Sequence, residues 1–201
     1  VRSRRQRQMC IRDSPGADPH RREWHRLHRG AGARGTAAVV TSASASEVLA
    51  ALIERGWTLG IAESLSGGAL AAEFVSVPGA SASLRGAIVA YATPVKHTLL
   101  GVDDGLLDAH GPVHPDVALQ MAAGARRALQ VSGVPADVGV STTGIAGPDS
   151  PDGQPVGTVH IAVVTPYTSV SEAFRFDGDR AQVRAQTVDA AVAMLARILR
   201  E

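Results

Sequence analysis

Two segments of the 201-residue chain hold side chains that a nucleophilic reaction needs. Residues 63–68 read Glu-Ser-Leu-Ser-Gly-Gly, and Lys96 is the only lysine in the chain. Ser64 or Ser66 could act as a nucleophile or as a hydrogen-bond donor. A lysine can lose its proton near neutral pH when it is removed from water, and a Ser–Lys pair can replace a Ser–His pair. The residue types therefore predict acyl-transfer chemistry, with a serine-capped turn and a surface lysine as the simpler alternatives.

Two further segments have the composition of a ligand pocket. Residues 141–149, Ser-Thr-Thr-Gly-Ile-Ala-Gly-Pro-Asp, follow a predicted strand, and open α/β sheets bind ligands where strands end. Arg180 and Arg184 stand one turn apart near the start of the last predicted helix. The helix dipole disfavours cations there, so an anion such as a phosphate would compensate for their placement. A glycine-rich connection and a pair of solvated arginines are the alternatives.

The pattern of apolar residues predicts the elements that must position these segments. Helices are expected over residues 46–56, 69–75, 94–100, 116–130 and 179–199, and strands over 57–63, 86–91, 136–145, 156–164 and 171–176. The last two strands follow each other closely enough to form a hairpin. This order predicts a three-layer α/β/α domain with a mixed sheet that helices cover on both faces.

Composition narrows the class of protein. Apolar residues make up 45% of the chain, which is enough for a core. No apolar run approaches the roughly 18 residues that span a bilayer. The single cysteine, Cys10, excludes an internal disulfide framework and a cysteine-based zinc site. The histidines lack metal-ligand spacing, so no metal site is expected.

The formal net charge of +1 averages two different parts of the chain. Residues 1–35 contain ten Arg and three acidic residues, whereas residues 36–201 contain ten basic and sixteen acidic residues. The acidic body offers no general attraction to nucleic acid or to an anionic membrane. The basic segment could be a nucleic-acid-binding arm, a transit peptide or non-native sequence, and the last is favoured because it resembles translated sequencing-adapter read-through. We expect residues 1–43 to be a disordered or non-native tail and linker, and residues 44–201 to be the functional domain.

Eight short motifs, taken in order, resemble the CinA C-terminal domain family (competence-damage-inducible protein A). They are AESLSGG at 62–68, SVPGAS at 76–81, GAIVAYATPVK at 86–96, LLGV at 99–102, HGPVHP at 110–115, TGIAGP at 143–148, PVGTV at 155–159 and GDR at 178–180. Together they cover roughly residues 46–199. The family occurs alone or fused to a molybdopterin-binding-like domain, and the chain is expected to resemble the stand-alone form.

The resemblance implies an amidohydrolase that deamidates nicotinamide mononucleotide to nicotinate mononucleotide and ammonia. It implies Ser64 as the nucleophile, Lys96 as the base and Tyr91 as a supporting catalytic residue. The expected substrate-binding residues are Ser66, Gly67, Gly68, Thr143, Gly144 and Arg180, with the N–H groups of Gly67 and Gly68 as candidates for the oxyanion hole. No metal or organic cofactor is implied. His114 stands where the usual motif, HGAVSP, has serine, which could alter a helix cap or the pocket rim.

The expected setting is a cytoplasmic homodimer that binds a pyridine nucleotide and neither a membrane nor nucleic acid. Three alternatives stay open. The domain could bind a nucleotide without turnover, it could be a DNA-associated competence or damage-response protein, or it could hydrolyse a different amide. The acidic body opposes the DNA-associated alternative, and the intact Ser64 and Lys96 oppose the purely binding one.

Overall fold

The computed structural model describes residues 43–150 and 153–201, which belong to the unit Thr41–Glu201. The expected basic tail lies outside these residues, apart from residue 43. The helices are α2 (Ala45–Arg55), α3 (Ala69–Val75), α4 (Thr93–Leu100), α5 (Asp104–His110), α6 (Pro115–Ala128) and α7 (Arg180–Arg200), with a 3-10 turn, η1 (Ala80–Ala82). The strands are β1 (Leu59–Glu63), β2 (Leu84–Val89), β3 (Val138–Gly144), β4 (Thr158–Val164) and β5 (Ser169–Arg175).

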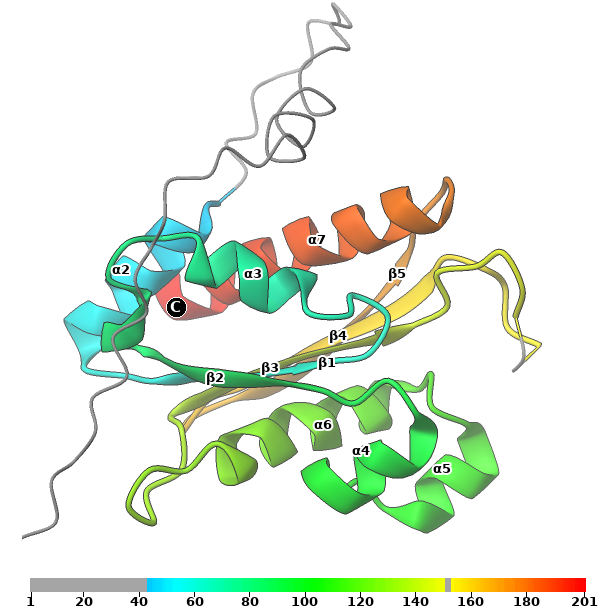
Figure 1. Cartoon of the computed structure of the whole chain (residues 1–201), viewed down its shortest axis with the longest axis horizontal. Coiled ribbons are helices and arrows are strands. Elements are labelled where there is room, and N and C mark those ends of the chain that lie inside the picture. The colour runs from blue at the N-terminus through cyan, green and yellow to red at the C-terminus, as the bar shows by residue number, and fades with distance from the viewer. Residues whose placement is uncertain (1–42, 151–152) are drawn as a thin grey trace, which may run out of the picture. The chain divides into compact units, whose positions relative to one another are not determined.

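The five strands form one mixed sheet in the order β2-β1-β3-β4-β5. Strand β1 pairs in parallel with both β2 and β3, whereas β3–β4 and β4–β5 are antiparallel. Helices α2, α3 and α7 cover one face of the sheet, and α4, α5 and α6 cover the other (Figure 1). The predicted three-layer α/β/α class, the mixed sheet and the terminal hairpin are therefore confirmed.

Burial follows the place of each strand in the sheet. All five residues of β1 are buried, because helices cover both faces of this central strand, and its sequence is accordingly apolar up to Glu63. The edge strand β5 alternates between more and less exposed residues, as its sequence predicts. Phe74 and Leu195 lie in the core beside α2, α3 and α7, while Met121 lies in the core beside α4, α5 and α6.

Local sequence signals set the element ends close to their expected positions. The Ser44 side chain caps α2, and Gly56 ends it with a left-handed backbone (φ 65°). Strand β2 (Leu84–Val89) begins and ends two residues earlier than the predicted strand over residues 86–91. In the described part of the chain, no helix is long and apolar enough to cross a membrane.

Candidate active site

The parallel strands bring three distant segments to one edge of the sheet. Ser64 directly follows β1, Tyr91 lies two residues beyond β2, and Gly144 ends β3. Because β1, β2 and β3 run in parallel, their carboxyl ends meet at this edge. A pocket of about 410 Å³ opens there, and Ser64, Tyr91 and Gly144 all line it. This is the location that the sequence predicts for ligand binding.

Lys96 contacts Ser64, and both residues line this pocket. Its Nζ donates hydrogen bonds to Ser64 Oγ at 2.9 Å and to the carbonyl oxygen of Ala90 at 2.7 Å. Lys96 is 1% exposed and Ser64 is 8% exposed, so the contact lies almost outside water. Lysine is rarely buried to this degree. The surface-lysine alternative is therefore wrong for this chain.

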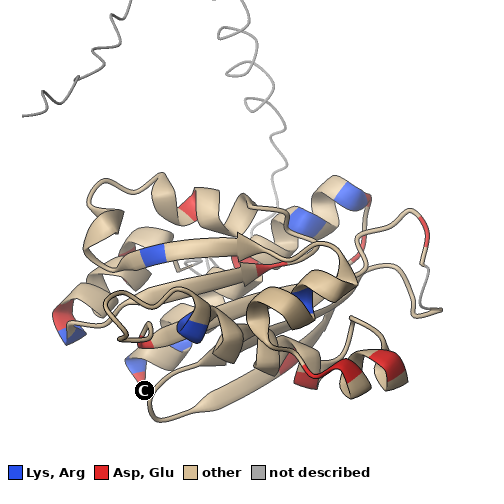
Figure 2. Ribbon diagram, turned by 60° about the horizontal axis from the view of Figure 1, so that its bottom comes forward, with Lys and Arg blue, Asp and Glu red and all other residues tan. Residues whose placement is uncertain are grey.

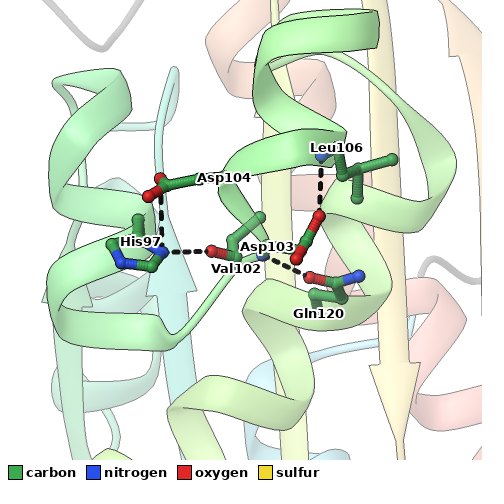
Figure 3. A network of polar contacts seen from close by, with 6 residues as sticks. All are labelled: His97, Val102, Asp103, Asp104, Leu106 and Gln120. Carbon is green, nitrogen blue, oxygen red and sulfur yellow. Dashed lines mark hydrogen bonds and ion pairs between the residues drawn. The ribbon is translucent and has the colours of Figure 1, made fainter.

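A polar network holds the end of helix α4, which carries Lys96. Next to Lys96, His97 Nδ1 lies 2.7 Å from the carbonyl oxygen of Val102 and 3.3 Å from Asp104 Oδ1 (Figure 3). The N–H of Asp103 donates to Gln120 Oε1 on α6 at 2.7 Å. These contacts join α4 to the start of α5 and to α6. They reduce the freedom of the helix that presents the lysine.

Glu63, which the sequence analysis did not assign to the site, occupies the N-terminus of α3. Its buried carboxylate accepts hydrogen bonds from the N–H groups of Gly68 (2.8 Å), Leu70 (3.2 Å) and Ala71 (2.8 Å). The helix end that was expected to receive an anion is thus already neutralised by a side chain. An acidic residue at the end of a fully buried strand was the signal that could have revealed this role.

Ser66, Gly67 and Gly68 do not line the pocket. The Ser66 hydroxyl is buried and hydrogen-bonded to Thr142 Oγ1 at 2.7 Å. The Gly67 N–H donates to the carbonyl oxygen of Ser64, and the Gly68 N–H donates to Glu63. Neither glycine N–H is thus available to an oxyanion. Both glycines have positive φ (61° and 93°), a backbone conformation that glycine adopts more readily than other residues. The geometry of the turn therefore explains why both positions are glycine.

Thr143 and Gly144 do line the pocket, at the end of β3. The Thr143 hydroxyl donates to the carbonyl oxygen of Pro112 at 2.6 Å and so attaches the 112–113 segment to the pocket wall. A Cβ atom on Gly144 would lie 2.6 Å from the carbonyl oxygen of Thr158. The close approach of β3 to β4 therefore requires this glycine, whatever its relation to a ligand.

The two arginines of α7 reach different parts of the site. Arg180 donates to the carbonyl oxygen of Gly147 and to the hydroxyl of Tyr91, both at 2.9 Å, and all three residues line the pocket. Arg184 instead donates to the carbonyl oxygens of Leu65 and Ser66. The interpretation that both guanidinium groups share one anion is therefore wrong, because the peptide backbone already engages Arg184. Asp149, the last residue of the 141–149 segment, also lines the pocket.

Comparison with known proteins identifies the family. The model of the CinA C-terminal domain matches residues 41–199. The chain belongs to this family. A CinA-like protein from Frankia casuarinae is 46% identical over 152 residues, which are 76% of this chain and 34% of that protein. A CinA-like protein from Anaeromyxobacter dehalogenans is 44% identical over 155 residues, or 76% of this chain and 36% of that protein. The CinA chain thus spans about a third of the length of these curated relatives.

Two solved structures resemble the CinA domain over most of its length. A competence-damaged protein (CinA) superfamily protein from Klebsiella pneumoniae has 34% identity and a TM-score of 0.71, with 78% of this chain and 95% of that chain covered. A CinA superfamily protein from Escherichia coli has 30% identity and a TM-score of 0.72, with 82% and 94% covered. The fold is therefore that of the CinA superfamily.

His114 takes over a capping role in this CinA domain. Its Nδ1 accepts the N–H of Asp116 at 3.2 Å as the N-cap of α6, and its ring stacks on His110 with centroids 4.6 Å apart. Histidine thus caps the helix start as a serine could.

Burial, together with the nearby His114, lowers the pKa of His160 below its ordinary value of 6.5. Within residues 43–150 and 153–201, no group of three or more His, Cys, Asp or Glu side chains could hold a metal ion.

Charge does not gather into a basic face in the view of Figure 2. Lys and Arg positions are scattered over several helices and strands, with acidic residues between them. Lys96, the single lysine, is buried at the site instead of exposed. This pattern gives no support to a nucleic-acid surface on that face.

Proposed function

We propose that this CinA domain is an amidohydrolase that deamidates nicotinamide mononucleotide to nicotinate mononucleotide and ammonia. The contact between Lys96 Nζ and Ser64 Oγ carries the proposal, because it places a general base within hydrogen-bond reach of a nucleophile in the lining of a pocket. Burial supports the role of Lys96, since removal from water favours the neutral amine that a base requires. Arg180, on the same pocket, would attract the phosphate of the nucleotide.

The reaction divides into two steps with one proton carrier. Ser64 Oγ bonds to the amide carbon while Lys96 takes the hydroxyl proton. The carbon–nitrogen bond then breaks, and Lys96 returns the proton to the departing nitrogen, which leaves as ammonia. In the second step, water attacks the carbonyl carbon of the acyl ester while Lys96 takes one of its protons. The ester carbon–oxygen bond then breaks, Lys96 returns that proton to Ser64 Oγ, and the product acid leaves as a carboxylate after giving its own proton to solvent. None of these steps uses a metal or an organic cofactor.

The negative oxygen of the tetrahedral intermediate needs a donor other than Gly67 and Gly68. Within the described backbone, the N–H groups of Leu65 and Ser66 have no acceptor. Leu65 lines the pocket directly after Ser64, whereas Ser66 does not line it. The proposed oxyanion donor is therefore the Leu65 N–H, the first one after the nucleophile.

The full chain, assayed for ammonia release from nicotinamide mononucleotide, tests this function. Lys96→Met keeps a long apolar side chain but removes the base, and Ser64→Ala removes the nucleophile. Each change is expected to lower kcat about 10³-fold or more, because the members of such a pair act as a unit. Wild-type activity in either variant would contradict the pair. A folded wild-type chain that releases no ammonia would contradict the substrate and lead to a panel of other amides.

A further inference from the structure

Arg184 reaches from helix α7 to the turn that follows Ser64. Its Nε donates to the carbonyl oxygen of Leu65 at 3.1 Å, and its Nη2 donates to the carbonyl oxygen of Ser66 at 2.7 Å. One half-buried guanidinium thus engages two successive peptide groups. A guanidinium is planar and presents its donors in a fixed fork, so the two contacts together define an orientation. A flexible ammonium group could not define it in the same way.

This fork decides which way the peptide groups of the turn face. In a planar trans peptide the N–H points away from the carbonyl oxygen, so the Gly67 N–H of the Ser66–Gly67 peptide points away from Arg184. This N–H donates to the carbonyl oxygen of Ser64, which belongs to the same peptide as the Leu65 N–H. The ends of the same turn are held by the Ser64 N–H, which donates to Thr142, and by the Gly67 N–H, which donates to Ser64. Arg184 contacts both carbonyl groups in the middle of the turn, where the Ser66 carbonyl oxygen also accepts the Ala69 N–H. Ser64, at its start, is then presented to Lys96 in one geometry.

Neither helix capping nor helix stability accounts for Arg184. Asp179 and Gln182 already form a capping box at the start of α7. A cation near a helix N-terminus is disfavoured by the helix dipole, so its placement there has a cost that the two carbonyl contacts offset. Arg180, one turn earlier on the same helix, contacts Tyr91 and Gly147 instead. The two arginines thus contact different parts of the site.

We infer that Arg184 is a positioning residue, which holds the Leu65–Ser66 and Ser66–Gly67 peptides directly and, through the Gly67 N–H, the Ser64–Leu65 peptide. It thereby aims the Ser64 hydroxyl and the Leu65 N–H at the reacting carbonyl. The inference rests on the proposed function for its substrate, but the geometry concerns Ser64 itself. A probe that reacts with an activated serine without any amide substrate can therefore test it separately.

The experiment compares full-length wild type with Arg184→Ala, Arg184→Lys and Arg200→Ala. Arg200 lies exposed at the far end of the same helix and serves as the matched control. Four quantities are measured: kcat and KM for ammonia release from nicotinamide mononucleotide, the rate at which a fluorophosphonate labels Ser64, and the midpoint of thermal unfolding. Arg184→Ala should lower kcat and the labelling rate about 10- to 100-fold, the size expected for a misplaced reacting group, with KM nearly unchanged. Arg200→Ala should match the wild type.

Added methylguanidine distinguishes positioning from general support of the fold. It should restore part of the labelling rate of Arg184→Ala without changing that of wild type, and Arg184→Lys should stay slow because one ammonium cannot reproduce the fork. If Arg184→Ala does not fold, slow labelling by a folded Arg184→Lys still supports the inference, and wild-type labelling overturns it. A raised KM with unchanged kcat and labelling also overturns it, since Arg184 would then contact the substrate.

The probe separates this inference from the proposed function. Wild type that is labelled at Ser64 but releases no ammonia contradicts the substrate alone, and the labelling rates of the variants then decide the role of Arg184. Wild type that is not labelled at Ser64 overturns the inference together with the Ser64–Lys96 pair.

Discussion

Lys96 Nζ lies 2.9 Å from Ser64 Oγ, although the two residues are 32 positions apart on different elements. Two hydrogen bonds of the Ala90 backbone explain how the fold achieves this. The Ala90 N–H donates to the carbonyl oxygen of Glu63, and the Ala90 carbonyl oxygen accepts from Lys96. The continuation of the β1–β2 pairing beyond the strands thus fixes the distance between nucleophile and base.

The two serines of the Glu-Ser-Leu-Ser-Gly-Gly turn should respond differently to replacement. Ser64→Ala should lower kcat about 10³-fold or more. Because Ser64 lines the pocket, water can replace its hydroxyl beside Lys96, so the loss in the free energy of unfolding should be smaller than for Ser66→Ala. Ser66→Ala leaves the buried Thr142 hydroxyl without its partner, so it should lower the free energy of unfolding by about 1–3 kcal/mol with a much smaller loss of kcat. Urea unfolding and the ammonia assay measure both. Complete loss of activity in a folded Ser66→Ala would contradict the assignment of Ser64 as the nucleophile.

Removal of the Glu63 carboxylate should destabilise the domain. Glu63→Ala leaves three N–H groups at the start of α3 without their acceptor, and we expect a loss of about 2–5 kcal/mol in the free energy of unfolding. Glu73→Ala is the matched control, because Glu73 is exposed on the same helix, and its effect should stay within about 0.5 kcal/mol. Equal effects of the two changes in urea unfolding would show that the helix cap contributes little.

Arg180 should affect the binding of a phosphate more than the chemistry. Arg180→Ala is expected to raise KM for nicotinamide mononucleotide about 10- to 100-fold, which corresponds to the loss of one charge-assisted hydrogen bond. The dephosphorylated riboside should show nearly the same KM with wild type and variant, since it lacks the group that Arg180 would bind. An equal rise for both compounds would instead show that Arg180 acts by holding Gly147 and Tyr91 in place.

His160 should make the domain less stable in acid. Its pKa in the folded domain is lowered, first by burial of the charged imidazolium and then by repulsion from His114. As the pH falls through 6.5, the unfolded chain therefore takes up a proton that the folded domain resists, and the free energy of unfolding decreases. His160→Phe removes this difference. Urea unfolding between pH 7.5 and 5 should show a flatter pH dependence for the variant, and identical slopes would exclude His160 as the cause.

The sequence predicted most elements because their signals are local. Residues 69–75 were expected to form a helix and do form α3, since Gly68 precedes a run of good helix formers. The edge strand β5 was recognisable from its alternation. Strand β2 was misplaced by about two residues because its burial alternates only weakly, and its register is set by pairing with β1. The homodimer, the cytoplasmic location and the substrate stay predictions.

The sequence by itself determined that Ser64 and Lys96 have the residue types of an acyl-transfer pair, because the rarity of lysine and the Ser-Gly turn are visible in the letters alone. Only the tertiary structure decided how the neighbouring groups are used. Glu63 takes the N-terminus of α3, Ser66 turns toward Thr142, and Arg184 binds peptide carbonyls. The physical reason is that each hydrogen-bonding group binds the partner that the packing of strands and helices brings within about 3 Å. For Ser66 and Arg184 that partner lies 76 or more positions away in the sequence.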